Sequence, residues 1–265
     1  MIVYLDLTEK FNRGRTRAIL AGGQAVVLHR LAIMSKDGDW ILREEFEAAQ
    51  HVLAVLEECG ARYRFGAPLD VRWLAGGWSA HFEFQSAGLR VRTDFVTRPP
   101  RLDGEALRRV WRDADGQEAP FLGAMDLAEA KKTNREKDYA VIGELARKMT
   151  TAESRLLYSR SARDLIALAE LHPDAMRRAA ERRPALAAVA QGRETLEAAL
   201  DVERRRLIRA NEERLAKYMD AAEPWAALWP ELSRQMAGRS LSEAHTMMVE
   251  RADAALPHSV PGGWP

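Results

Sequence analysis

Hydrophobic and polar positions alternate with two different spacings in the first part of the chain. The segment RAILAGG (residues 17–23) predicts a short buried strand that ends at two glycines, and QAVVLHRL (24–31) predicts a helix directly behind it. The segment AIMSKDGDWIL (32–42) predicts a second strand. Residues 43–60 carry apolar side chains at helical spacing and stop at Gly60, a residue typical of helix C-termini. The chain is therefore expected to open as strand, helix, strand, helix.

Two further strands with alternating faces are predicted downstream. The runs WSAHFEFQ (78–85) and LRVRTDFV (89–96) are separated by the small residues SAG, which indicates a hairpin that extends the same sheet. A short helix is expected over 104–111. Residues 124–148 again have helical spacing, with a turn near Thr133.

The pattern changes near residue 150, after which nearly every window has helical spacing, including a long amphipathic segment over 193–219. Five prolines are expected to start or break helices: Pro173, Pro184, Pro224, Pro230 and Pro257. We therefore predict an α/β (α+β) domain with a mixed sheet and flanking helices over 1–150. An all-α domain over 151–256 and a flexible tail over 257–265 are expected to follow.

Composition narrows the class of protein. A hydrophobic fraction of 47% with 30% charged residues is ordinary for a globular chain. Apolar runs stay well short of the ~20 residues that span a membrane, so no membrane contact is expected. The first residues mix charges among apolar positions, unlike a secretory leader, which favours a cytoplasmic location. The single cysteine, Cys59, excludes an internal disulfide and a cysteine metal cluster.

The formal net charge of +1 argues against a strongly basic nucleic-acid clamp. A small local groove of arginines is the alternative to such a clamp. Arg90, Arg92 and Arg98 lie close to Asp94 in the sequence, and such a groove would steer RNA despite the near-neutral total charge.

Two aspartates in the second predicted strand carry the candidate chemistry. Residues two apart on a strand project to the same side, so Asp37 and Asp39 would repel each other unless a cation lies between them. A hard divalent ion such as Mg²⁺ suits these oxygen ligands and leaves coordination places for phosphate. Gly22 and Gly23, between strand and helix, let backbone N–H groups approach a phosphate. The alternative is a plain type I′ turn at Lys-Asp-Gly-Asp.

The spacing of these residues resembles the signature of the nucleotidyltransferase fold shared with the DNA polymerase beta superfamily. The likeness is to bacterial abortive-infection toxins and minimal nucleotidyltransferases. Their pattern is Gly-Gly-x-Ala, a later His, and a Ser or Thr two residues before Asp-x-Asp. The matching residues are in register without a gap: Gly22, Gly23, Gln24, Ala25, His29, Ser35, Asp37 and Asp39.

This resemblance, which covers about residues 18–148, implies further roles. It implies that Asp94 is the third carboxylate, so that Asp37, Asp39 and Asp94 bind Mg²⁺ or Mn²⁺ and act in catalysis. The residues implied to bind an NTP substrate are Gly22, Gly23, Ser35, Lys131, Lys132 and Lys137. The expected reaction moves a nucleotidyl group from the NTP to an acceptor hydroxyl. Toxin relatives imply RNA, tRNA or protein as acceptor, and an antitoxin as partner.

Three other functions stay open. The same fold transfers nucleotides to small molecules such as aminoglycosides. A degenerate domain would bind nucleotide or a protein partner without turnover; Gly38, which favours a looser strand between the two aspartates, and Val141, where the family has an acidic residue, point to it. In a purely structural protein, the C-terminal helices would make the contacts.

Overall fold

The computed structural model describes residues 2–261 and divides them into two compact units. Unit 1 contains residues 2–28, 32–122 and 215–261 of this range, and unit 2 contains 29–31 and 123–214. The chain therefore leaves unit 1 near residue 122 and returns to it near residue 215, inside one long helix.

Unit 1 holds the sheet and the helices that cover it. Its elements are α1 (Ile2–Phe11), β1 (Ala18–Ala21), α2 (Gly22–Leu28), β2 (Asp37–Leu42), α3 (Phe46–Glu58), β3 (Arg62–Tyr63), α4 (Val71–Leu74), β4 (Ala80–Ser86), β5 (Leu89–Val96), α5 (Gly104–Ala114), the second half of α11 (Arg193–Met236) and α12 (Leu241–Ala255).

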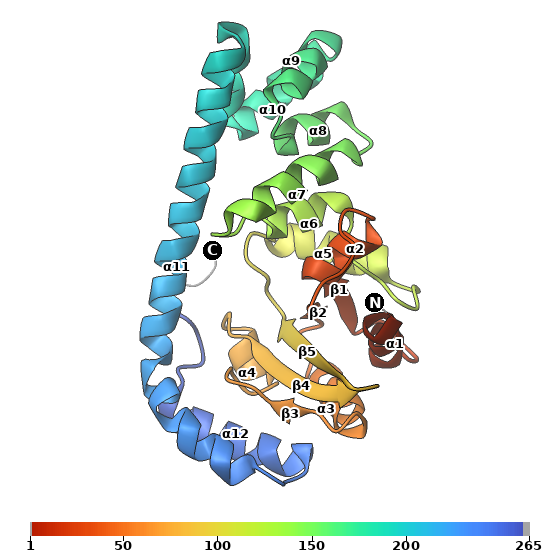
Figure 1. Cartoon of the computed structure of the whole chain (residues 1–265), viewed down its shortest axis with the longest axis vertical. Helices are drawn as coiled ribbons and strands as arrows, with labels where there is room; N and C mark the ends of the chain where they lie inside the picture. Colours follow the sequence, from red (N-terminus) through yellow and green to blue (C-terminus); the bar gives the residue numbers. More distant parts are fainter. Residues whose placement is uncertain (1, 262–265) are drawn as a thin grey trace. The chain divides into compact units, whose positions relative to one another are not determined.

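The five strands form one mixed sheet in the order β1-β2-β5-β4-β3. The central pair, β2 and β5, is parallel, and the other neighbours are antiparallel (Figure 1). The hairpin between β4 and β5 turns at Ala87 and Gly88, whose φ values of 49° and 75° are both positive, as a two-residue type I′ turn requires. At the β1 edge, Leu20 N–H donates to the Pro120 carbonyl at 2.9 Å.

Aromatic side chains fill one side of this sheet. The Trp40 ring stacks on Phe95 with centroids 5.4 Å apart, and Phe11 from α1 meets Trp40 edge-on. A Cβ at Gly38 would come within 2.5 Å of the Trp40 ring and 2.6 Å of the Tyr4 ring. Gly38 therefore makes room for two aromatic rings, and the strand is packed there rather than loosened.

Unit 2 consists of helices around a small aliphatic core. Its elements are α6 (Ala124–Ala130), α7 (Glu136–Arg147), α8 (Ala152–Tyr158), α9 (Ala162–Leu171), α10 (Pro173–Arg182), the 3₁₀ helix η1 (Pro184–Gln191) and the first half of α11. The fully buried leucines of this core include Leu156, Leu165, Leu186 and Leu196.

Most predicted elements correspond to observed ones, and the fold is mixed α/β, with helices from residue 151 to the end of the described chain. The compact units do not coincide with the predicted domains at 1–150 and 151–256. Of the predicted tail, residues 257–261 are described: Val260 N–H donates to the Gly76 carbonyl at 2.9 Å, and the rest lies outside the described residues.

The prediction that Pro224 and Pro230 break a helix is wrong, since both lie inside α11. A proline in a helix interior removes one backbone hydrogen bond and costs about 3 kcal/mol. Packing offsets this cost here, because the adjacent Trp225 is 1% exposed and its Nε1 donates to the Gly66 carbonyl at 2.9 Å. Over residues 2–261, the helices are all too short or too polar to cross a membrane.

Candidate functional site

The face of the sheet opposite the aromatic core carries the charged residues. Alternation places Asp37 and Asp39 of β2 on this face, while Gly38 and Trp40 are buried. In the parallel pair β2 and β5, Asp39 is the register partner of Asp94. Two of the three aspartates that the resemblance implies are thus direct neighbours across adjacent strands, and Asp37 lies two residues away on the same face.

The glycine turn lies against this pair of strands. Ala21 is the register partner of Asp39 in the antiparallel pair β1 and β2, so Gly22 follows directly at the strand end. Gly22 has φ +55°, and a Cβ there would lie 1.8 Å from Asp39 Oδ2. This position therefore requires glycine for two reasons: its backbone conformation and the close approach of the carboxylate.

Gly23 and Ser35 meet in the same way. A Cβ at Gly23 would lie 2.1 Å from Ser35 Oγ. Gln24 Nε2 donates to the Ser35 carbonyl at 2.9 Å, which ties the loop before β2 to α2. The structure thus brings Gly22, Gly23 and Ser35 next to the aspartate strand, so the aspartates do face the glycines.

Asp37 has an incomplete set of partners. Arg92 Nη1 lies 3.5 Å from Asp37 Oδ1, which is an ion pair at long range. The same oxygen is buried and accepts no hydrogen bond from the described residues. A contact at 3.5 Å is at the limit of hydrogen-bond geometry, so the Arg92 ion pair does not satisfy this oxygen. A buried oxygen in this condition has capacity for a further cation or donor.

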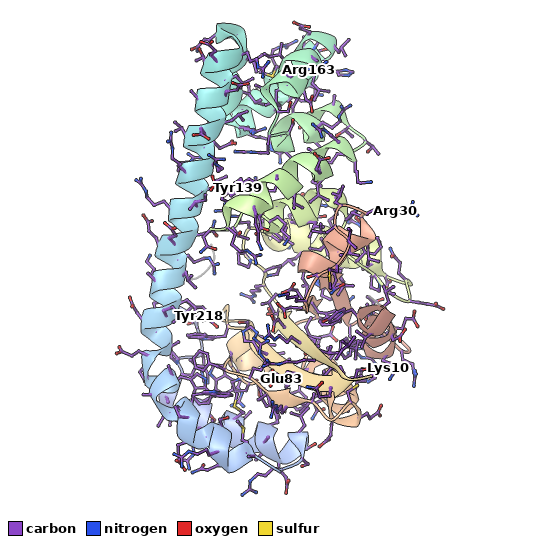
Figure 2. All side chains as sticks on the ribbon, in the orientation of Figure 1. Lys10, Arg30, Glu83, Tyr139, Arg163 and Tyr218 are labelled. Atoms are coloured by element: carbon purple, nitrogen blue, oxygen red, sulfur yellow. The ribbon has the colours of Figure 1, made fainter. Side chains whose placement is uncertain are left out.

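Asp94 is held by a chain of polar side chains. His81 Nδ1 lies 2.7 Å from Asp94 Oδ1, and Arg64 donates to the same oxygen at 3.3 Å. The other ring nitrogen, His81 Nε2, lies 2.8 Å from Ser79 Oγ, which in turn lies 3.3 Å from the Tyr218 hydroxyl. Tyr218 belongs to α11 (Figure 2). These bonds fix both the histidine ring and the Asp94 carboxylate.

Asp37 and Asp39 meet only part of what a divalent cation requires. Residues 2–261 hold no group of three or more His, Cys, Asp or Glu side chains placed to hold a metal ion. The buried, unbonded Oδ1 of Asp37 does fit an oxygen-seeking cation, with Asp39 two residues along the same strand face. Asp94 would complete such a set only by turning from His81 and Arg64.

The three candidate lysines belong to unit 2, whereas the aspartates belong to unit 1. Lys131 is 8% exposed and its Nζ lies 3.6 Å from the buried Asp138. Lys132 donates to Glu129 at 2.6 Å and lies over the Tyr158 ring. Lys137 is exposed in the first turn of α7.

Two residues that contact Asp94, Arg64 and His81, were not predicted from the sequence. Arg92 was predicted only as one of three groove arginines, with Arg90 and Arg98. Arg92 does contact Asp37, whereas Arg98 makes two bonds to Glu44 at 2.7 and 2.6 Å. Register was the missing information, because Arg92 is the partner of Asp37 only in the parallel pairing of β2 with β5.

Comparison of the whole chain with protein-family models, with curated proteins and with solved structures gives no match.

Proposed function

We propose that this chain is a metal-dependent nucleotidyltransferase that moves a nucleotidyl group from an NTP to a hydroxyl of an acceptor. The observation that carries the proposal is the close approach of Gly22 to Asp39, where a Cβ would lie 1.8 Å from the carboxylate. A glycine turn at a helix start next to a strand aspartate puts phosphate-binding backbone beside metal-binding oxygens. A plain surface turn would not require that contact.

The register of the sheet supports the same function. Asp39 and Asp94 are partners on adjacent parallel strands, and Asp37 shares their face. Asp37 and Asp39 would hold the ion, and Asp94 would accept the proton of the attacking hydroxyl. Mg²⁺ or Mn²⁺, when bound, would supply positive charge to the phosphate oxygens.

Other parts of the proposal rest on the family resemblance alone. The acceptor would be RNA, tRNA or a protein side chain, and an antitoxin would be the partner. That Lys131, Lys132 and Lys137 bind the triphosphate stays a prediction of the resemblance.

The experiment is label transfer from each α-³²P NTP, with Mg²⁺ or Mn²⁺, into total cellular RNA and protein. Wild type is compared with Asp37→Ala/Asp39→Ala, after circular dichroism has shown that the variant keeps its helices. We expect label with wild type and none with the variant. Equal labelling by the two proteins would reject the proposal.

A second function, nucleotide binding without turnover, is favoured by one observation. The cations near these carboxylates are arginines, with Arg92 at 3.5 Å from Asp37 and Arg64 at 3.3 Å from Asp94. Internal ion pairs of this kind compete with a metal for the same oxygens. NTP binding, with or without a divalent metal, and no labelled product under any condition would decide for this second function.

A further inference from the structure

A cavity lies at the β3 edge of the sheet, away from the glycine turn. Its volume is about 510 Å³, which is within the usual range of small-molecule sites. All of its lining residues belong to unit 1 and come from β3 and the residues on either side of it, from β4 and β5, and from the end of α11 and the start of α12 with the turn between them. The lining contains four arginines, Arg62, Arg64, Arg90 and Arg239, against one carboxylate, Glu83.

Glu83 on β4 organises two of these arginines (Figure 2). Arg62 donates through Nε and Nη2 to one carboxylate oxygen at 3.0 and 2.7 Å, and Arg90 donates through the same two nitrogens to the other oxygen. Burial alone raises the pKa of Glu83, but the bonds from Arg90 and Arg62 outweigh it and hold that pKa below the ordinary value. The carboxylate therefore stays ionised and fixes both guanidinium groups.

The outer sides of these guanidinium groups are open. The Arg62 and Arg90 side chains are 78% and 52% exposed, while the Glu83 side chain is 8% exposed. Among residues 2–261, nothing accepts a hydrogen bond from Nη1 of either arginine. Two oriented guanidinium groups with free donors form a geometry suited to phosphate oxygens.

An aromatic pair lines the same cavity. Phe65 and Trp229 meet edge-on with centroids 5.6 Å apart, and Phe65 is 38% exposed. An exposed ring next to arginines is a stacking surface for a base. The cavity therefore offers donors for a phosphate next to an aromatic surface for a planar ring.

We propose that this cavity binds a nucleotide unit, with its phosphate on Arg62 and Arg90 and its base against Phe65 and Trp229. The site adjoins the aspartates through Arg64, which lines the cavity and bonds to Asp94 at 3.3 Å. It does not depend on transfer chemistry, so loss of this site and loss of transferase activity can be told apart.

The test is isothermal titration calorimetry with adenosine 5′-monophosphate in EDTA. The parent protein is the full chain with Asp37→Asn/Asp39→Asn, so that metal-dependent binding at the aspartates does not contribute. Arg62→Gln/Arg90→Gln is expected to weaken binding about tenfold or more, because two bidentate donors are lost. Arg98→Gln is the matched control, since Arg98 also makes two bonds to one carboxylate on the same sheet domain and lines no part of this cavity.

Three results would overturn the proposal: no binding by the parent, no change in Arg62→Gln/Arg90→Gln, or an equal loss in Arg98→Gln. Should the glutamine variant fail to fold, Arg62→Lys/Arg90→Lys keeps the charge and removes the planar fork. Unchanged affinity in the lysine variant would then count against the site, and a severalfold loss would support it.

The aromatic contribution is tested with ribose 5-phosphate as the second probe. We expect adenosine 5′-monophosphate to bind more tightly, and Phe65→Leu to remove most of this advantage while leaving ribose 5-phosphate binding unchanged. Equal binding of the two probes by the parent would reject the nucleotide assignment.

A short single-stranded oligoadenylate RNA identifies the source of the nucleotide unit. Tighter binding than the free nucleotide, lost in Arg62→Gln/Arg90→Gln, would assign the site to an RNA strand. Affinity no better than that of the free nucleotide would assign it to a soluble nucleotide.

Discussion

Glu83 and Glu203 are both shielded from solvent and each accepts hydrogen bonds from two arginines, but the remaining donors of these arginines are used differently in the two sets. In unit 2, Glu203 accepts from Arg160 and Arg183. Arg183 also donates to the Leu156 and Ser159 carbonyls at 2.7 and 2.9 Å, and its side chain is 5% exposed. In this closed set, the donors of the guanidinium groups are directed at other parts of the protein.

The set around Glu83 in unit 1 is open. Its two arginines bond to the carboxylate and leave their outer donors to a cavity. One glutamate and two arginines are therefore used in two different ways. A closed set joins segments of the chain and stabilises the fold, whereas an open set holds donors ready for a ligand at little gain in stability.

The largest expected difference is in stability. Glu203→Gln leaves two buried guanidinium groups without their anion, which should reduce the free energy of unfolding by about 3–5 kcal/mol. Glu83→Gln is the matched change in the open set and should cost about 1 kcal/mol or less, because its arginines can be solvated. Urea unfolding followed by circular dichroism measures both, and equal losses would invalidate the comparison.

A smaller effect on stability is expected from Gly22, which lies against the Asp39 carboxylate. Gly22→Ala places a methyl group 1.8 Å from Asp39 Oδ2 at φ +55°, so both the backbone and the carboxylate must shift. We expect a loss of about 2 kcal/mol and loss of label transfer. Gly60→Ala is the control, with φ +66° and open space around the added carbon, and should cost about 1 kcal/mol without affecting transfer. Full transfer activity in Gly22→Ala would show that Asp39 has no part in the reaction.

These cases show what the sequence could predict. Apolar periodicity and glycine positions are local signals, and they predicted β1, the β4–β5 hairpin and the end of α3. The sequence also predicted that Gly22 lies between a strand and a helix, ahead of the strand that carries Asp37 and Asp39, but it did not predict the close approach of Gly22 to Asp39.

The remaining features depend on contacts between distant segments. The two-residue strand β3 is too short to produce a periodic pattern, and the passage of α11 through Pro224 depends on the burial of Trp225. The partners of Asp37 and Asp94 depend on strand order, which spacing along the chain does not encode. The Glu83 set was missed for the same reason, since its members lie on three strands.

The two units should also respond to acid at different pH values. Burial lowers the pKa of His245. The charge of Asp70 raises that pKa in part, and the charge of Arg72 lowers it further, so that it stays below the ordinary value. The Tyr63 hydroxyl accepts a hydrogen bond from Leu69 N–H and lies 2.7 Å from His245 Nδ1, and the lowered pKa keeps the His245 ring neutral at pH 7. The unfolded chain binds a proton near pH 6.5, so the stability from neutral His245 is full above that pH and declines below it.

Glu203 responds at lower pH. Burial raises its pKa, but Arg183 and Arg160 outweigh burial and hold the pKa below the ordinary 4.5, so its contribution is lost only as the pH falls below that value. All tryptophans of the described chain lie in unit 1, so tryptophan fluorescence follows that unit while circular dichroism follows both. We expect the fluorescence midpoint in urea to fall between pH 7.5 and 5.5. His245→Asn should flatten this fall, and Glu203→Gln should not. A fall that is unchanged in His245→Asn would assign the acid response to another group.

The smallest expected effect concerns Arg98, which makes two bonds to Glu44 without a second arginine on that carboxylate among the described residues, and which does not line the cavity at Glu83. Both side chains are substantially exposed, at 47% and 37%. Arg98→Gln should therefore change the free energy of unfolding by about 0.5 kcal/mol or less. If urea unfolding shows a larger loss of free energy of unfolding, then the exposure of an arginine does not tell whether it stabilises the fold or is available to a ligand. A change of about 0.5 kcal/mol or less would show that an exposed arginine–carboxylate pair adds little stability by itself. The Glu83 and Glu203 sets would then differ in stability because of what the other donors of their arginines contact.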